Sequence, residues 1–475
     1  MMTRQSVSIA KEDQVPFGKK LAYALGGPVD ILSVWVLVSI AYQVFNMELK
    51  MRPTYVSIIL MSLRAWDGVV DPIMGWVSDN FRSKWGRRRP FILVGAILSS
   101  LTYPLIWWFP MDWGQEQIML WVIGFGILFY SCFTVWAMPY QSLLMEMTPD
   151  YNERTRVTEI RGYFQTLAGL LNGWMWWISL LPLFFLPTGE ESALNGMRYL
   201  SLGISAIILL LGVIPAIFVK ERYYEKVRQH QQKVSLIKSF RETLSNGPFL
   251  ILCGFIVCFL LGTAIFDSYG RYVGTYYVLG ADWSVAATFA GYGTFVYTAF
   301  SLLFIPAFRW LSEQIGKPKC LAISTALVLF SASTTWWTFT PDYPYLMLLN
   351  TVFIGAGYAG LWLMVSSMQA DVVDFDELKT GERREGSFAA IFSWILKFAF
   401  CIGFLLSGPL LELTGFDAAL EAAQPESVLR NMRIGYIVIP VVALVIALIL
   451  LKMFPITPTK AAEIRAQLEA RRGQV

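Results

Sequence analysis

Two aspartates, Asp67 and Asp71, lie four residues apart inside an apolar stretch that begins near Tyr55. Residues three or four apart share one face of a helix, so both carboxylates would project to the same side, together with Arg64. Each carboxylate at mid-bilayer costs about 2.5–3.5 kcal/mol, and two that are one turn apart repel each other unless a proton or cation bridges them. The pair therefore predicts a site for H+ or Na+, to which Thr134 would add a hydroxyl oxygen.

A simpler explanation of the same residues stays open. Arg64 could neutralise Asp67, while Asp71 could lie close enough to the cytoplasmic end of its helix to be hydrated. In that case the two carboxylates would be structural.

Four more charged residues lie inside apolar stretches. Asp30 follows Gly26-Gly27-Pro28, which loosens a helix, and it has no neighbour in the sequence with which to pair. We therefore expect an unpaired acid that faces the substrate. Asp267 and Arg271 are four residues apart, so an intrahelical ion pair and a substrate contact are both open. Lys397 lies too deep in its stretch for its ammonium group to reach the interface easily.

A basic block follows the acidic pair. It comes after Asp79 and comprises Arg82, Lys84, Arg87, Arg88 and Arg89. Basic residues next to an apolar span mark its cytoplasmic end. We also expect this block and Asp79 to act as a cytoplasmic latch, although a pure orientation signal would look the same.

The elements that position these residues are predicted from hydropathy. The chain is 56% hydrophobic and only 15% charged, whereas soluble domains are about 25% charged. Uniformly apolar stretches of about 20 residues predict an all-α polytopic membrane protein. Twelve spans are expected, at residues 20–45, 54–79, 91–111, 117–146, 158–187, 198–220, 248–279, 284–308, 319–339, 344–373, 387–412 and 432–454.

The longest polar connection divides the spans into two sets of six. Most of the 38 Lys and Arg residues fall in alternate connections, which predicts cytoplasmic N- and C-termini. The chain turns polar after residue 455, and its amphipathic segment from Lys460 to Arg472 is expected to be a solvated tail helix. The predicted parts are a cytoplasmic N-terminus at 1–19, a six-helix bundle at 20–220, a central cytoplasmic loop at 221–247, a second six-helix bundle at 248–454 and a cytoplasmic tail at 455–475.

Several classes of protein are disfavoured by composition. The single histidine, His230, falls in a polar loop, and the five cysteines lie in or beside apolar stretches without metal-ligand spacing. Neither a histidine-based metal centre nor a Ser-His-Asp triad is expected, so we predict neither an enzyme nor a cofactor other than a coupling ion. The polar first 20 residues predict no cleavable signal peptide, and the net charge of +4 gives no sign of nucleic-acid binding.

Three motifs carry a family resemblance. The first is Asp67-x-x-x-Asp71-Pro72-x-x-Gly75-x-x-x-Asp79 with the following GRRRP, the second runs from Pro139 to Thr148 and on to Arg156, and the third is ADVVDFDELKTGERREG, with Lys397 beyond it. Together they resemble the glycoside–pentoside–hexuronide:cation symporters, the melibiose permease-like branch of the major facilitator superfamily. The two sets of six spans agree with that fold.

The resemblance implies an alternating-access symporter that takes up a sugar together with a cation. It implies that Asp67, Asp71 and Thr134 bind the cation, with Asp67 and Asp71 as ligands if that cation is Na+. Asp30, Arg161 and Lys397 match sugar-binding positions of the family. With the charged residues and neighbouring aromatics added, the expected substrate-binding set is Asp30, Tyr140, Gln141, Arg161, Asp267, Arg271, Trp394 and Lys397. The expected gating set is Asp79, Arg87, Arg88, Arg89, Glu146 and Arg154.

Two departures from the family pattern leave the solute and the ion open. Val70 stands where the family has an Asn, which removes one oxygen ligand and favours proton coupling over sodium. Ala137 and Gln141 stand where the family has a sugar-binding acid and a Trp, which disfavours an α-galactoside held in the usual way. The expected substrate is a glycoside, pentoside or hexuronide; the alternative is a lysolipid or another amphiphile. The resemblance implies a monomer in the plasma or inner membrane.

Overall fold

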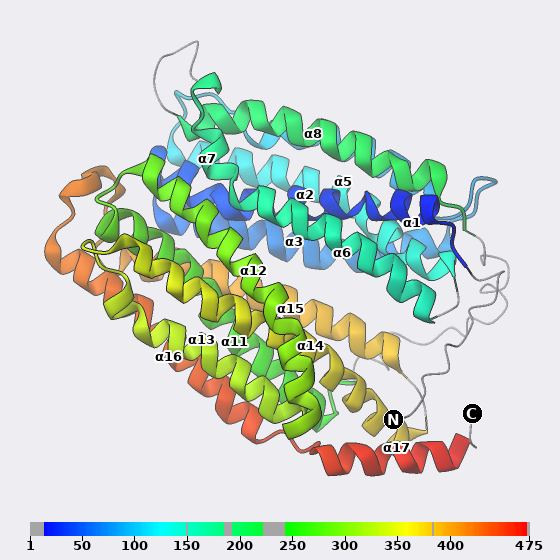
Figure 1. The fold of residues 1–475 in the computed structure, drawn as a ribbon. Coiled ribbons are helices and arrows are strands. Elements are labelled where there is room, and N and C mark those ends of the chain that lie inside the picture. The colour runs from blue at the N-terminus through cyan, green and yellow to red at the C-terminus, as the bar shows by residue number, and fades with distance from the viewer. Residues whose placement is uncertain (1–13, 149–150, 185–191, 222–242, 382–383, 473–475) are drawn as a thin grey trace. The chain divides into compact units, whose positions relative to one another are not determined.

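Every secondary-structure element of the described residues is helical in the computed structural model (Figure 1). The structure describes residues 14–148, 151–184, 192–221, 243–381 and 384–472. His230 and most of the predicted central loop 221–247 lie outside this part of the chain. Helical structure follows from the long apolar stretches, because a helix satisfies its own backbone hydrogen bonds where no water is present.

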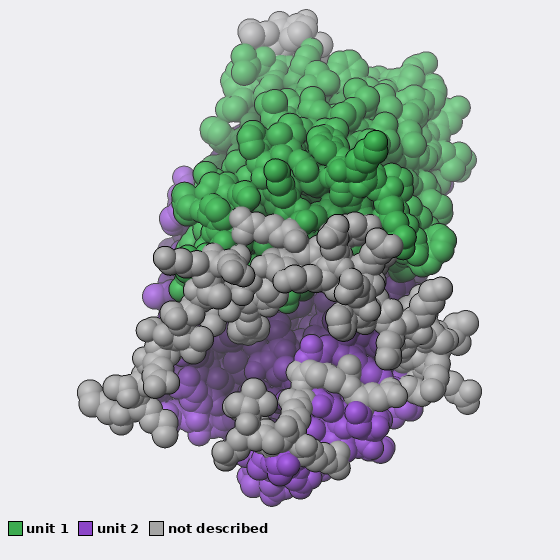
Figure 2. All heavy atoms as spheres, turned by 90° about the vertical axis from the view of Figure 1, so that its right-hand side faces the viewer, with its two compact units in different colours: residues 1–49, 65–232 green, residues 50–64, 233–475 purple. Residues whose placement is uncertain are grey.

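The described residues form two compact units, coloured separately in Figure 2. Unit 1 comprises residues 1–49 and 65–232, and unit 2 comprises residues 50–64 and 233–475. Helix α3 (Pro53–Asn80) contributes its first part to unit 2 and its second part, with Asp67 and Asp71, to unit 1.

The other helices of unit 1 follow the chain in order. They are α1 (Phe17–Ala24), α2 (Gly27–Ala41), the π-helix η1 (Tyr42–Glu48), α4 (Arg89–Thr102), the 3₁₀ turn η2 (Pro104–Ile106), α5 (Gln115–Met147), α6 (Tyr151–Gly173), α7 (Met175–Ser179), η3 (Pro182–Phe184) and α8 (Ala193–Phe218).

Unit 2 contains the remaining helices. They are α11 (Gly247–Tyr272), the π-helix η4 (Val273–Val278), α12 (Trp283–Ile315), α13 (Lys317–Thr338), the turn η5 (Pro344–Leu346), α14 (Met347–Thr380), α15 (Glu385–Glu412), η6 (Ala418–Ala423), α16 (Glu426–Lys452) and α17 (Pro458–Arg472).

Ten helical segments of the described residues are long and apolar enough to cross a membrane. They correspond to ten of the twelve predicted spans. The other two predictions, 54–79 and 158–187, fall on α3 and on α6 with α7, where charged or polar residues lower the mean hydropathy. The all-α, multi-pass architecture predicted from the sequence is thus confirmed.

The core of unit 1 is built around Trp136 of α5, which is fully buried. Its indole Nε1 donates to the Gly212 carbonyl of α8 at 3.0 Å. Gly95 of α4 packs against the Trp136 backbone so closely that a Cβ on Gly95 would lie 2.4 Å from the Trp136 nitrogen. Glycine is therefore required where α4 meets α5.

The tail helix α17 differs from the prediction. The expected solvated helix instead buries Ile464 and Leu468, each only 4% exposed, in the hydrophobic core of unit 2. Pro458 at its start lies against Gly316, and Lys460 stands 5.7 Å from the ring of Phe375 on α14. Leucine and isoleucine four residues apart form an apolar stripe long enough to hold this polar helix on the protein.

Candidate functional site

The first predicted span breaks at Leu25 and Gly26, between α1 and α2. The ring of Tyr140 fills the space beside this break, since a Cβ on Gly26 would lie 2.4 Å from a Tyr140 ring carbon. The break places Asp30 in the first turn of α2, where the helix dipole favours a negative charge. The glycines and proline before Asp30 therefore position this carboxylate.

Asp30 is paired, and the sequence-based expectation of an unpaired acid is wrong. Arg161 of α6 donates from Nη2 to Asp30 Oδ2 at 2.7 Å, and Gln165, one turn further on, donates from Nε2 to the same oxygen at 3.1 Å. The side chains of Asp30 and Arg161 are 20% and 14% exposed. A buried carboxylate and guanidinium stabilise each other when hydrogen-bonded, so this pair is the polar centre of unit 1.

Two tyrosines complete this cluster. The Tyr140 ring stacks on Tyr23 at 4.7 Å between centroids, and the Arg161 guanidinium stands 5.1 Å from the Tyr140 ring. The Tyr140 hydroxyl donates to the Tyr23 carbonyl at 2.8 Å, so its ring rather than its hydroxyl faces the guanidinium. Arg161 Nε and Tyr23 Oη are buried without a hydrogen-bond partner among the described residues. A solute hydroxyl would satisfy such groups.

The predicted cation-binding residues lie on α3 and α5 of unit 1. Thr134 Oγ1 donates to Asp71 Oδ1 at 3.0 Å, and Asp67 is buried with 6% exposure. Trp66 Nε1 donates to Ser131 Oγ at 2.8 Å and holds the two helices together nearby. The structure thus brings Thr134 to Asp71, as the sequence predicted for these two residues.

Asp67 and Asp30 both carry carboxylates within unit 1. Like charges repel each other, and they do so more strongly in a low-dielectric interior than in water. No group of three or more His, Cys, Asp or Glu side chains suited to a metal occurs among the described residues.

The basic block after α3 is held inside unit 1. Arg87 donates to Glu146 Oε1 from Nε at 2.8 Å, and Arg88 reaches the same oxygen at 3.2 Å. Arg88 Nη1 also donates to Ser78 Oγ at 2.7 Å. Arg89 instead donates to two carbonyls at the end of α8, those of residues 216 and 217. Three of the predicted gating arginines are thus anchored to their own unit.

Another predicted gating residue, Arg154, lies apart from this cluster. Arg154 donates from Nε to the Thr148 carbonyl at 2.8 Å, within the connection from α5 to α6. The Asp79 side chain lies outside the described part of the structure.

Glu221, at the end of unit 1, was not predicted from the sequence. Its carboxylate accepts from the backbone N–H groups of Arg87, Arg88 and Arg89 at 2.9, 2.8 and 3.2 Å. Gly86 has a φ of +104°, and a Cβ there would lie 2.4 Å from Glu221 Oε1. The glycine of the GRRRP motif was the signal in the sequence that could have pointed to this contact. Consecutive N–H groups after such a glycine, at a helix N-terminus, form a site for an anion.

The predicted substrate residues of unit 2 lie on α11 and α15. Arg271 Nη2 donates to Asp267 Oδ2 at 2.7 Å, so these two residues form the intrahelical pair that the spacing allowed. Trp394 is 49% exposed and stacks on Phe398, while Lys397 is half-buried one turn from Trp394. In unit 1, Gln141 is exposed.

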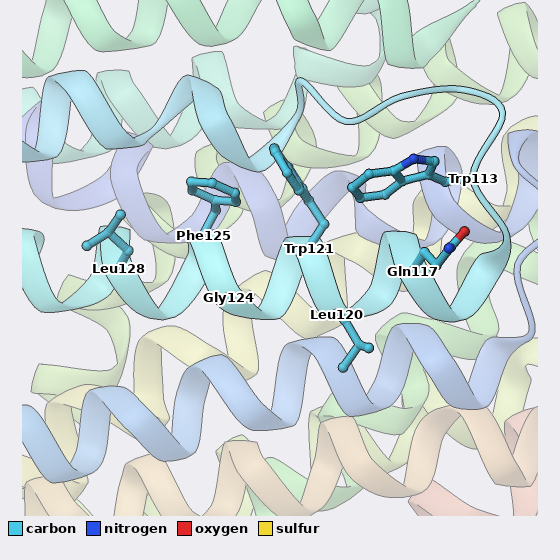
Figure 3. Close-up of a pocket in the computed structure, with 7 residues that line it drawn as sticks. All are labelled: Trp113, Gln117, Leu120, Trp121, Gly124, Phe125 and Leu128. Carbon is cyan, nitrogen blue, oxygen red and sulfur yellow. The ribbon is translucent and has the colours of Figure 1, made fainter.

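A groove on the surface of α5 is lined by none of these residues (Figure 3). It is lined by Trp113, Gln117, Leu120, Trp121, Gly124, Phe125 and Leu128. Its lining carries no charged side chain.

Comparisons with known proteins agree with this architecture. The family model described as MFS/sugar transport protein matches residues 23–458. The uncharacterized symporter sll1374 of Synechocystis is 28% identical, with 98% of each chain covered. The putative glycoside/cation symporter YagG of Escherichia coli is 26% identical, covering 96% of this chain and 95% of the relative.

Two further comparisons are with a lysophosphatidylcholine symporter and with a solved structure. The sodium-dependent lysophosphatidylcholine symporter 1 of Gallus gallus is 24% identical, covering 95% of this chain and 88% of the relative. The crystal structure of the nucleoside transporter NupG superposes with a TM-score of 0.62 at 14% identity, covering 92% of this chain and 98% of NupG.

The ten apolar helical segments and the match to the family model define a multi-pass membrane transporter. The chain belongs to the MFS/sugar transport protein family, and the predicted resemblance to cation symporters of glycosides is confirmed.

Proposed function

We propose that this chain carries a sugar or glycoside across the membrane together with H+ or Na+, by alternating access. The observations that carry the proposal are two hydrogen-bonded polar groups inside unit 1: Asp71 with Thr134, and Asp30 with Arg161 and Gln165. Membership of the sugar-transport family and the relative YagG support the same conclusion.

The coupling ion binds at Asp67 and Asp71, with Thr134 as a third oxygen. Two carboxylates and a hydroxyl suit a hard cation, and a shared proton would equally relieve their repulsion. Val70 adds no oxygen ligand from the α3 side chain next to Asp71. That absence favours H+ over Na+.

The solute binds at the cluster of Asp30, Arg161 and Gln165. Their carboxylate, guanidinium and amide groups match the mixed donors and acceptors of sugar hydroxyls, and the Tyr140 ring offers an apolar face. The buried Arg161 Nε supplies a further donor.

Coupling follows from charge. A cation at Asp67 weakens the repulsion that this residue exerts on Asp30, so the cluster becomes more favourable for the solute. By linkage, the solute must tighten cation binding by the same factor. Without the cation, the buried charge opposes the conformational change that moves the solute.

A second candidate substrate is a lysolipid or another amphiphile. The specific observation in its favour is the 24% identity to the sodium-dependent lysophosphatidylcholine symporter 1. The polar cluster in unit 1 would then bind the head group.

The remaining parts of the proposal concern the membrane location, orientation and oligomeric state of the protein and the direction of transport. We place the protein in the plasma or inner membrane with both termini in the cytoplasm, and we propose a monomer that mediates uptake. Its activity is transport without catalysis, and it needs no cofactor beyond the coupling ion.

The test is electrical. Purified protein is reconstituted on a supported membrane, and currents are recorded after jumps of glycosides, pentosides, uronates or lysophosphatidylcholine, with and without Na+ and across a range of pH. We expect a current for a sugar that Asp67→Asn abolishes, while the exposed Asp342→Asn control keeps it. A folded protein with no sugar current, or with current only for the lysolipid, would contradict the sugar proposal.

A further inference from the structure

Helices α2 and α6 pack side by side (Figure 1), and a second polar group joins them beyond the Asp30 cluster. Ser39 of α2 donates from Oγ to Oδ1 of Asn172 on α6 at 3.0 Å. Asn172 follows Gln165 by seven residues, so the two amides share a face of α6 and lie about 10 Å apart. Gln43, one turn beyond Ser39, is only 3% exposed, and its Oε1 has no hydrogen-bond partner among the described residues. The α2–α6 contact thus carries polar groups at two levels.

The side of α6 between the two levels is open. A Cβ on Gly169 would meet no atom within 4 Å, although Gly169 is itself half-buried. Gly203 of α8 is equally unobstructed but exposed, so the space beside Gly169 is a sheltered hollow and not an outer surface. Thr166 borders this hollow. Its hydroxyl has no hydrogen-bond partner in the described part of the chain, whereas Thr158 of the same helix donates to the carbonyl one turn back at 2.9 Å.

The exposed apolar residues of α6 lie on its other side. Tyr163, Leu167 and Leu171 follow one another at intervals of four and are 67%, 65% and 39% exposed. In a membrane helix the apolar side faces lipid, and polar residues face the protein interior or a water-filled cavity. The hollow beside Gly169 is therefore on the side of α6 that a dissolved solute can reach.

We propose that Thr166, Gly169 and Asn172 form a second subsite, which accepts the second ring of a two-ring glycoside while the first ring binds at the Asp30 cluster. This inference rests on the proposed function and specifies its substrate class. Two helical turns, about 10 Å, exceed the length of one sugar ring and match that of two linked rings. The subsite offers a hydroxyl, an amide and an open floor without a side chain, which suit the hydroxyl groups of a second ring.

The test compares one sugar ring with two. The probe pairs are methyl β-D-glucopyranoside with cellobiose, methyl β-D-xylopyranoside with xylobiose, and methyl β-D-galactopyranoside with lactose. Each probe is titrated calorimetrically into the purified full chain at the pH and Na+ concentration that give the largest transport current. In at least one pair we expect the two-ring sugar to bind at least about tenfold more tightly than the methyl glycoside, because it gains hydrogen bonds at the second level.

Three variants assign this gain to the subsite. Gly169→Leu fills the hollow and should weaken binding of the two-ring sugar at least about tenfold, while that of the methyl glycoside changes less than about twofold. Thr166→Val and Asn172→Ala each remove one polar group and should weaken only the two-ring sugar, about three- to tenfold. Gly203→Leu adds the same side chain at an unobstructed exposed position and should change neither affinity. Retained binding of the methyl glycoside shows that a variant is folded.

The outcomes separate the two proposals. A wild-type protein that binds no member of any pair contradicts the proposed function together with the subsite. Equal affinity for one ring and two rings, in a protein that binds both, overturns the subsite alone. So does a Gly169→Leu variant that binds the two-ring sugar as tightly as the wild type, or one that loses both probes equally, since the hollow would then not be specific to the second ring.

Discussion

Gln165 illustrates how a single side chain can tune the solute cluster. Its amide donates to the same Asp30 oxygen that Arg161 binds, so it fixes the plane of the carboxylate and leaves the second oxygen to a ligand. These hydrogen bonds hold the buried carboxylate in one orientation before the solute arrives. Less conformational entropy is therefore lost when the solute binds.

We expect Gln165→Ala to weaken solute binding about three- to tenfold, because one hydrogen bond to a charged acceptor is lost. Cation affinity measured without solute should change less than twofold, since Gln165 does not contact the acidic pair. Calorimetric titration of each ligand checks this, with the exposed Gln314→Ala as a matched control. A variant that loses cation affinity equally would contradict the assignment of Gln165 to the solute.

Residue types and spacing predicted part of this chemistry. Asp67, Asp71 and Thr134 could be predicted because two of them share a helix face and the family pattern supplied the third. The Asp30–Arg161 pair was missed as a pair because its members are 131 residues apart. Gln165 was missed altogether, since a glutamine on a polar helix carries no signal until the partner across the unit is known.

At the scale of elements, the turn between α3 and α4 depends on an acid from the end of α8. Glu221 satisfies three backbone N–H groups at the start of α4, while the arginine side chains of the same turn bind Glu146 and the α8 carbonyls. The turn and both adjoining helices are thus joined by charge-assisted hydrogen bonds.

Glu221→Ala should lower the free energy of unfolding of unit 1 by about 1–3 kcal/mol, because three N–H groups lose their acceptor. Thermal melting in detergent, followed by fluorescence, should show a midpoint several degrees below the wild type. The exposed Glu313→Ala removes a surface ion pair with Arg309 and should change the midpoint little. Equal melting of the two variants would disprove the capping role.

Gly95→Ala should destabilise the contact between α4 and α5. The new methyl would meet the Trp136 backbone, which cannot move as a flexible side chain can. Gly124→Ala on α5 is the matched control, since nothing lies within 4 Å of its added carbon and helix propensity favours alanine by up to about 1 kcal/mol. We expect a lower melting midpoint for the first variant and an equal or higher one for the second.

The sequence predicted the positions of the helices better than it predicted their tertiary contacts. Apolar length alone located most spans, because a membrane helix must be long and apolar. The amphipathic tail helix was predicted, but its packing was not, because the two apolar residues Ile464 and Leu468 are too few to show that this stripe packs on unit 2. The break at Gly26 was anticipated from the glycines and proline, whereas the Tyr140 ring that fills it comes from α5.

At the scale of the whole molecule, the two binding functions proposed for unit 1 are coupled through the like charges of Asp67 and Asp30. Asp67 belongs to the acidic pair, and Asp30 belongs to the solute cluster. Helix α3 carries Asp67 in unit 1 and begins in unit 2, where Thr54 N and Arg52 donate to Glu412 of α15 at 3.1 Å each. A charge change at the acidic pair therefore acts on a helix that is anchored in both units.

The measurement that tests this account most directly is reciprocal binding. Solute affinity is determined by calorimetry at low and saturating cation, and cation affinity is determined with and without the solute identified in the current assay. We predict that each ligand tightens the other by the same factor, about 5- to 150-fold, and that Asp67→Asn removes this effect. Equal solute affinity with and without the cation, in a protein that binds both, would contradict coupling through Asp67 and Asp30.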